Sequence, residues 1–332
     1  MNSESLLTAR PTGHPRRRQE ALVLLGLLAL FAVGVGTLAL GTGWDRTMAQ
    51  FARIGPVQIG VLLGLSLVNY LFRGLRWHLL TRHAGMQTAL GQSLRHFLGG
   101  FALSVTPARL GELVRMRWLR REIGWPIERT APLALVDRAA DLAAMGVLLA
   151  LSVAFSTAGI GLALPVAGLA VLASVLVTRP VLMTALVTLA WRGCGRMPRL
   201  FARLRTAARG LHLFTRARAL APVLAVGVVG WLAEGYAFHI LLVWLGADLS
   251  LAASVAIFLF ATLAGGLTGA PGGLGGAEAA IMALLLLNGI DADAALAATA
   301  IIRITTLWFA ILTGMAVFPF AERMSRRGAY AQ

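Results

Sequence analysis

Long apolar runs dominate this chain and alternate with short arginine-rich segments. A helix of about 20 apolar residues crosses a hydrocarbon core of about 30 Å. Runs of this kind predict six membrane-spanning helices, at residues 21–40, 55–72, 131–155, 159–177, 220–245 and 295–318. The pattern therefore predicts an all-α integral membrane protein.

Two shorter apolar stretches are interrupted by similar motifs that begin with proline and end with glutamate. The first motif reads PARLGE at residues 107–112, and the second reads PGGLGGAE at residues 271–278. Lipid cannot satisfy a broken backbone, so such breaks occur where protein covers them or where they line a polar cavity. We expect a re-entrant hairpin at each motif, or up to eight spans if the hairpins cross the membrane.

The placement of arginine predicts the orientation of the spans. The chain has 30 cationic residues, all of them arginine, and most lie in residues 1–20, 73–129, 179–218 and 321–332. By the positive-inside rule, both termini are then cytoplasmic. With six spans, the two broken motifs enter from opposite sides. This arrangement predicts an inverted repeat, which in transporters places the binding site at the repeat interface.

Composition agrees with a membrane location and gives the domain organisation. The chain is 58% hydrophobic and 13% charged, with a mean hydropathy of +0.77, which is too apolar for a soluble domain. We expect a basic tail (1–20), one transmembrane domain (21–320) with a basic amphipathic segment (192–218), and a second tail (321–332). Because the arginines flank apolar runs, the net charge of +16 indicates contact with anionic lipid headgroups and not with nucleic acid.

Signals for catalysis, metals or cofactors are weak. The single cysteine, Cys194, allows no intrachain disulfide and no cysteine-based metal site. The histidines lack metal-ligand spacing, and the fingerprints of serine hydrolases, P-loops and dinucleotide sites do not occur. We therefore expect no metal and no cofactor, and transport is favoured over enzymatic activity. Acid pairs leave a lipid-modifying enzyme open.

Charged residues inside apolar runs are the candidate site, since each costs at least a few kcal/mol in the bilayer unless it has a partner. Asp137 and Asp141 are four residues apart and share a helix face. A structural ion-pair network explains these charges as readily as headgroup binding does. The glycines of the second break either expose amide groups to an anion or form a packing seam. The candidate substrate-binding residues are Arg73, Arg109, Glu112, Arg115, Asp137, Arg138, Asp141, Pro271, Gly272, Gly273, Gly275, Glu278 and Arg303.

Five strings carry a resemblance to a known family: RGLRW (73–77), TPARLGELVR (106–115), DRAAD (137–141), PGGLGGAE (271–278) and RITTLW (303–308). Together they resemble the flippase-like transmembrane domain of lysylphosphatidylglycerol synthases, including stand-alone YbhN-type (UPF0104) and hopanoid-associated membrane proteins. The resemblance covers residues 21–320, with Asp137 where glutamate is expected. It implies a bacterial inner-membrane protein that moves lipid. The soluble aminoacyltransferase domain of the synthases has no counterpart here, so lysylphosphatidylglycerol synthesis is not expected.

The leading hypothesis is a lipid translocase in which the two breaks form a polar site at the membrane midplane. Arg73, Arg109 and Arg303 would meet an anionic headgroup, and Glu112 and Glu278 would pair with these arginines. The alternatives are an integral enzyme or accessory of polyprenyl, hopanoid or glycolipid biosynthesis, and a scaffold for lipid-synthesis partners. In each case the expected partners are membrane lipids.

Overall fold

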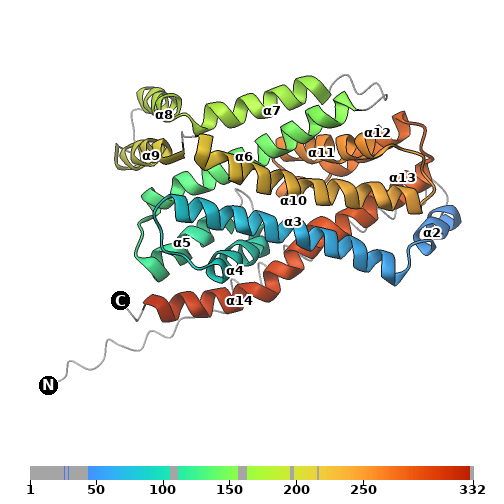
Figure 1. Ribbon diagram of the computed structural model, residues 1–332, viewed down its shortest axis with the longest axis horizontal. Helices are drawn as coiled ribbons and strands as arrows, with labels where there is room; N and C mark the ends of the chain where they lie inside the picture. The colour runs from blue at the N-terminus through green and yellow to red at the C-terminus, as the bar shows by residue number, and fades with distance from the viewer. Residues whose placement is uncertain are drawn as a thin grey trace.

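The computed structural model describes residues 44–104, 111–155, 163–194, 198–214 and 217–329, and the single positions Gly26 and Ala29. These parts are helical, and the long helices lie side by side in one bundle (Figure 1). The expected first span (21–40), most of the first break (105–110, including Arg109) and the side chain of Glu112 lie outside the described residues.

Three helices are long and apolar enough to cross a membrane. The first is α3 (Pro56–His83), which begins with a proline in its first turn, where the missing N–H costs nothing. The second is α10 (Ala217–Trp244). The third runs from α13 (Ala292–Arg303) through a π-helical turn (Ile304–Trp308) into α14 (Phe309–Ala329). The expected tail at 321–332 is thus helical as far as residue 329.

The count of six spans is not confirmed, because the described residues contain three candidate spans, or four if one bent pair is counted. The α6 helix (Ile127–Ala154) is long enough, but the charges at its centre make it less apolar than a typical span. The expected span at 159–177 contains α7 (Ala163–Thr178), which has only 16 residues. A bend of 82° separates α7 from α8 (Pro180–Cys194), so this pair adds at most one broken span among the described residues.

Short helices flank both broken motifs. Before the first motif lie α4 (Leu90–Gly100) and a 3₁₀ turn (Phe101–Leu103), and α5 (Gly111–Ile123) follows it. The second motif joins α11 (Leu251–Leu267) to α12 (Gly276–Leu287) through a 3₁₀ turn (Pro271–Gly273). In each pair the two helices pack against each other. The expected short apolar segments on both sides of the second break are confirmed.

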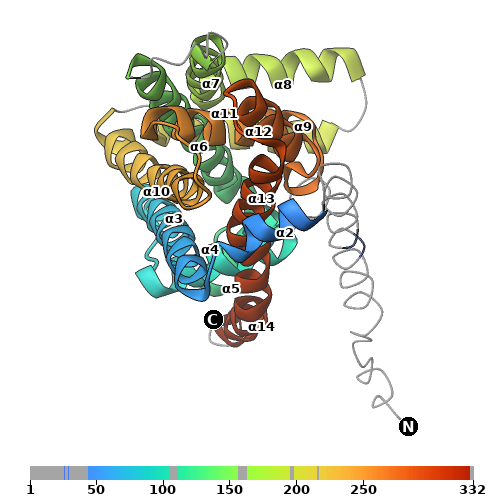
Figure 2. The same cartoon turned by 90° about the vertical axis from the view of Figure 1, so that its right-hand side faces the viewer.

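The basic amphipathic segment expected at 192–218 is divided among several elements. Its first residues close α8, and α9 (Pro198–Gly210) and a 3₁₀ turn (Leu211–Phe214) follow. In Figure 1, α7, α8 and α9 lie together along one side of the bundle, and α9 also packs against α6. Near the opposite end, α2 (Trp44–Ala52) crosses the bundle close to α13 (Figure 2).

Two hydrophobic cores fill the bundle. The larger core joins α6, α10, α11, α12 and α13, with residues such as Leu149, Phe238 and Ile302. The smaller core joins α3, α4, α5 and α6 around Trp77 and Leu133. On α6 the two cores meet between Ala140 and Ala144, so Asp141 lies at their boundary. A charged layer is therefore held between two apolar cores.

Candidate functional site

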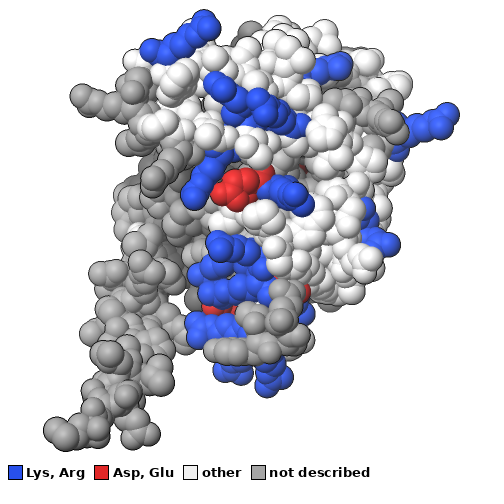
Figure 3. Space-filling model, turned by 90° about the vertical axis from the view of Figure 1, so that its left-hand side faces the viewer, with Lys and Arg blue, Asp and Glu red and all other residues white. Residues whose placement is uncertain are grey.

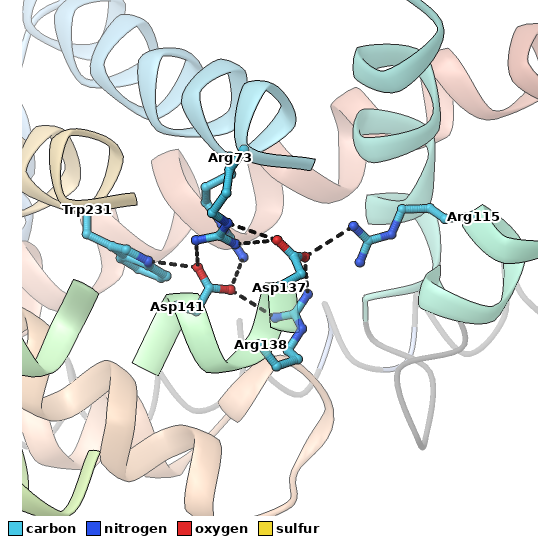
Figure 4. Close-up of polar contacts among 7 residues, drawn as sticks. Arg73, Arg115, Asp137, Arg138, Asp141 and Trp231 are labelled. Atoms are coloured by element: carbon cyan, nitrogen blue, oxygen red, sulfur yellow. Dashed lines mark hydrogen bonds and ion pairs between the residues drawn. The ribbon is translucent and has the colours of Figure 1, made fainter. Parts of the chain in front are cut away.

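Two aspartates on α6 form the centre of a buried ion network with α3 (Figure 4). Arg76 is fully buried and contacts both, with its Nη2 atom 2.7 Å from Asp137 Oδ1 and its Nη1 atom 2.8 Å from Asp141 Oδ1. Arg73, one turn earlier on α3, donates from Nη2 to Asp141 Oδ2 at 3.0 Å. The spacing of the aspartates predicted their shared face, and α3 supplies the opposite charges.

The helices α5 and α10 close this network from two further sides. Arg115 of α5 donates from Nη1 to Asp137 Oδ2 at 3.3 Å, and its guanidinium lies 4.5 Å from the centre of the Trp77 ring. Trp231 of α10 donates from Nε1 to Asp141 Oδ1 at 2.9 Å, and its ring lies 5.0 Å from the Arg73 guanidinium. Four helices thus contribute to one buried site.

Arg138 completes this network at its more exposed edge. Its Nη1 atom lies 3.3 Å from Asp141 Oδ2. Among the described side chains, four arginines of this network therefore face two aspartates. Buried charges are retained where they are paired or where they bind a ligand. Guanidinium binds phosphate and carboxylate with two parallel hydrogen bonds, so this side-chain chemistry is compatible with an anionic ligand.

The second break forms another, partly buried ion pair. Arg303, the last residue of α13, contacts Glu278 Oε1 from Nε at 2.7 Å and donates from Nη2 to the carbonyl oxygen of Gly272 at 2.8 Å. Gly272 and Gly275 have φ values of 63° and 82°, which a residue with a side chain rarely adopts. Arg303 therefore holds a backbone bend that only glycine allows without strain.

The π-helical turn after Arg303 links this second site to α3. A π turn shifts the helical hydrogen bonds by one residue, and such turns are frequent at functional sites. The hydroxyl of Tyr70 on α3 donates to the carbonyl oxygen of Thr306 within the turn. Tyr70 precedes Arg73 by three residues, so one face of α3 contacts both sites.

Glu234 on α10 is close enough to both sites to interact electrostatically with an arginine of each. It is 5% exposed, and it has neither an ion pair nor a hydrogen bond with the residues that the structure describes. The charges of Arg73 and Arg303 attract its carboxylate, and that of Asp141 repels it. Arg73 of the first site and Arg303 of the second thus both act on Glu234, and the Tyr70–Thr306 hydrogen bond links the same two regions.

A separate polar cluster ties α4 to α5 outside the candidate spans. Glu122 Oε2 accepts from Arg95 Nη2 at 2.7 Å, and Glu122 Oε1 lies 3.0 Å from His96 Nε2. Burial lowers the pKa of His96 below its usual value of 6.5. Burial opposes ionisation of Glu122, but hydrogen bonds from His96 and Gln92 and the charge of Arg95 outweigh it and lower the pKa below 4.5.

The structure divides the predicted site residues into two groups. Arg73, Arg115, Asp137, Arg138 and Asp141 form the first network, and the expected pairing of Arg303 with Glu278 is confirmed. Arg73 was expected to pair with Glu112, whose side chain is not described; its observed partner is Asp141. The second group comprises Pro271, Gly272, Gly273, Gly275, Glu278 and Arg303.

Four residues of this region were absent from the predicted site: Tyr70, Arg76, Trp231 and Glu234. Arg76 and Glu234 are recognisable in the sequence as charged residues inside apolar runs. The sequence does not predict which residue each one contacts. Tyr70 and Trp231 join through hydrogen bonds to residues distant in sequence. Within the described part of the chain, no group of three or more metal-ligating side chains is present.

The fold and the site together define a multi-pass membrane protein with a charged interior. The model of the lysylphosphatidylglycerol synthase TM region matches residues 22–314, and the chain belongs to this family. A UPF0104 membrane protein of Methanothermobacter thermautotrophicus (strain Delta H) is 27% identical over 119 residues. This match covers 35% of the present chain and 36% of that relative. The chain therefore spans about a third of the length of the curated relative that it matches.

Proposed function

We propose that this protein is a lipid translocase that binds an anionic headgroup between Arg73 and Arg303 and moves the lipid between the leaflets. The main support is the link between the two sites: Tyr70, one helical turn before Arg73 on α3, donates to the carbonyl oxygen of Thr306, three residues after Arg303. A phosphate group in this region would find guanidinium groups on two sides. The lipid class is an anionic phospholipid or a polyprenyl or hopanoid lipid with an anionic group.

The two pairs of short helices fit this proposal as re-entrant hairpins. The α4 and α5 helices have 11 and 13 residues, so each extends for less than 20 Å at about 1.5 Å per residue. Neither helix alone crosses about 30 Å of hydrocarbon. The α11 and α12 helices would form the matching hairpin of an inverted repeat, with a site near the interface of the two halves.

The surface charge supports an orientation with both termini in the cytoplasm of a bacterial inner membrane. Basic side chains gather on the end of the molecule where α5, α9 and the end of α14 lie (Figure 3). Acidic atoms lie in a recess among these basic groups. An arginine-rich end favours contact with the anionic cytoplasmic leaflet. The recess would then admit headgroups from that leaflet.

The proposal is tested by removing both charges of the second site together. Glu278→Gln with Arg303→Gln leaves no orphaned charge, so the protein should fold. In vesicles of phosphatidylcholine and phosphatidylglycerol, the wild-type protein should move fluorescent phosphatidylglycerol between leaflets, and the double variant should not. Arg203→Gln is the control, because Arg203 is an exposed arginine paired with Glu128 at the surface. A folded double variant with wild-type transport would refute the proposal.

A further inference from the structure

The contact between α3 and α10 contains a buried polar side chain that the ion network does not use. Asn69 on α3 is 0% exposed, and neither its amide oxygen nor its amide nitrogen has a hydrogen-bond partner among the described residues. A buried amide normally has such partners, because an unsatisfied polar group destabilises the fold. A leucine would fill similar space without destabilising the fold in this way. The presence of an amide here therefore indicates a role other than packing.

Asn69 lies at the middle of α3, which runs from Pro56 to His83. At about 1.5 Å per residue, the helix is longer than the hydrocarbon core, so its middle lies near the membrane centre. Arg73 follows one turn later on α3. The amide of Asn69 therefore extends the polar face of the ion network from Arg73 toward the N-terminal end of α3.

Glycines of α10 face this polar stretch and bring the two helices close together. A Cβ atom at Gly230 would lie 3.5 Å from the Asn69 amide nitrogen and 3.4 Å from Phe72 Cβ. A Cβ atom at Gly227 would lie 3.3 Å from Nη1 of Arg76. Glu234 follows Gly230 by one helical turn. We call this contact, formed by Asn69, Phe72, Gly227 and Gly230, the α3–α10 seam.

The contact of α10 with α11 differs from this seam because its buried polar groups have partners: His239 Nδ1 of α10 lies 3.2 Å from Ser254 Oγ of α11. The sequence of α11 (Leu251–Leu267) contains no charged residue. Gly235 of α10 faces Val255, where an added Cβ atom would lie 3.4 Å from the valine Cβ. Among the described residues, this contact therefore offers a headgroup no buried polar side chain that lacks a partner.

We propose that the α3–α10 seam is the path along which the lipid headgroup passes the centre of the membrane, with Asn69 as its binding residue there. This inference rests on the proposed translocase function and adds the route. The small glycines let the seam close tightly when it is empty. As α3 and α10 separate, the amide of Asn69 donates to and accepts from the headgroup after it leaves Arg73, while the acyl chains stay in lipid.

The first test replaces the amide by an apolar group of similar size. Asn69→Leu should retain phosphatidylglycerol in native mass spectrometry, because Arg73 and Arg303 remain. Its transport rate in phosphatidylcholine–phosphatidylglycerol vesicles should fall by about tenfold or more, the effect of one lost polar contact in the transition state. Asn69→Ser keeps a donor and an acceptor and should restore part of the rate. Wild-type transport by Asn69→Leu would overturn the proposal.

The second test locks the seam reversibly and keeps Asn69. In a Cys194→Ser background, Phe72→Cys with Gly230→Cys places two Cβ atoms close to the spacing of a disulfide. The oxidised protein should still bind phosphatidylglycerol but should not transport it, and reduction should restore transport. Gly235→Cys with Val255→Cys is the matched control, because it links α10 to α11 at the same Cβ separation. This control should transport lipid in both redox states.

The outcomes separate this route from the translocase function itself. Equal transport by the oxidised and reduced seam variant would overturn the route and leave lipid translocation standing. A wild-type protein that retains phosphatidylglycerol but never moves it would refute translocation, and the route with it. Loss of transport in both crosslinked variants would also overturn the route, because the effect would then not be specific to the seam.

Discussion

Arg76 is the residue whose loss should disturb the ion network most. Its side chain is 0% exposed, and it contacts both aspartates. In an Arg76→Met variant, Asp141 keeps Arg73, Arg138 and the Trp231 indole. Asp137 keeps only Arg115 at 3.3 Å and a longer contact with Arg138 at 4.0 Å among the described residues. The uncompensated charge therefore falls on Asp137.

Breaking a buried ion pair on one side costs about 3–5 kcal/mol, since the remaining charge stays in a low-dielectric interior. For a chain of this size, we expect the thermal unfolding midpoint of purified Arg76→Met to fall by roughly 5–10 °C. Tryptophan fluorescence in detergent would measure the midpoint. Arg203→Met is the control, because the exposed Arg203–Glu128 pair should contribute at most about 1 kcal/mol.

A second substitution tests the electrostatic reasoning directly. Adding Asp137→Asn to Arg76→Met removes the orphaned negative charge, so at least half of the lost midpoint should return. If the double variant were less stable than Arg76→Met alone, packing of the arginine stem and not charge compensation would explain the loss. An unchanged midpoint in Arg76→Met itself would refute the structural role of the network.

Three further predictions concern single contacts. Trp231→Phe keeps a ring near Arg73 but removes the N–H donated to Asp141, which should cost about 1.5–3 kcal/mol; an unchanged unfolding midpoint would contradict it. Gly265→Ala should destabilise the α11–α12 contact, because its Cβ atom would lie 2.7 Å from Ala277 Cβ, whereas Gly266→Ala meets nothing within 4 Å and should be neutral in the same assay. The free energy of unfolding should also decrease as the pH falls below 6.5 and again as it falls below 4.5. The reason is that His96, and then Glu122, binds a proton more readily in the unfolded protein than in the folded protein. In a plot of the unfolding midpoint against pH, Glu122→Gln should flatten the lower step.

The sequence predicts elements where one physical requirement dominates. Long apolar runs predict α3, α10 and the α13–α14 helix, because only a helix satisfies its own backbone in lipid. The proline and glycines at 271–276 predict a break that the structure contains. The predicted span at 131–155 is not confirmed, because α6 has the length of a span but carries charged residues at its centre.

The ion network was predictable only in part. The spacing of Asp137 and Asp141 places them on one helix face without reference to other segments. Their main partner, Arg76, lies 61 residues before Asp137, and three arginines in residues 73–82 fit the sequence pattern equally well. Three-dimensional packing selects Arg73 and Arg76 for the aspartates, and the third, Arg82, falls in the last turn of α3.

Glu234 shows that the interior also holds an acidic side chain outside the ion pairs of the described residues. A residue with strong partners on one helix would fix that helix, as Arg303 fixes the second break. Glu234 instead experiences Arg73 and Arg303 from a distance and forms no ion pair with any residue described. A headgroup phosphate that meets both arginines would have to share them with Asp141 and Glu278, their present partners. The ion pairs thus hold the helices in place, and a phosphate bound beside Glu234 would be repelled by its carboxylate unless that group is protonated.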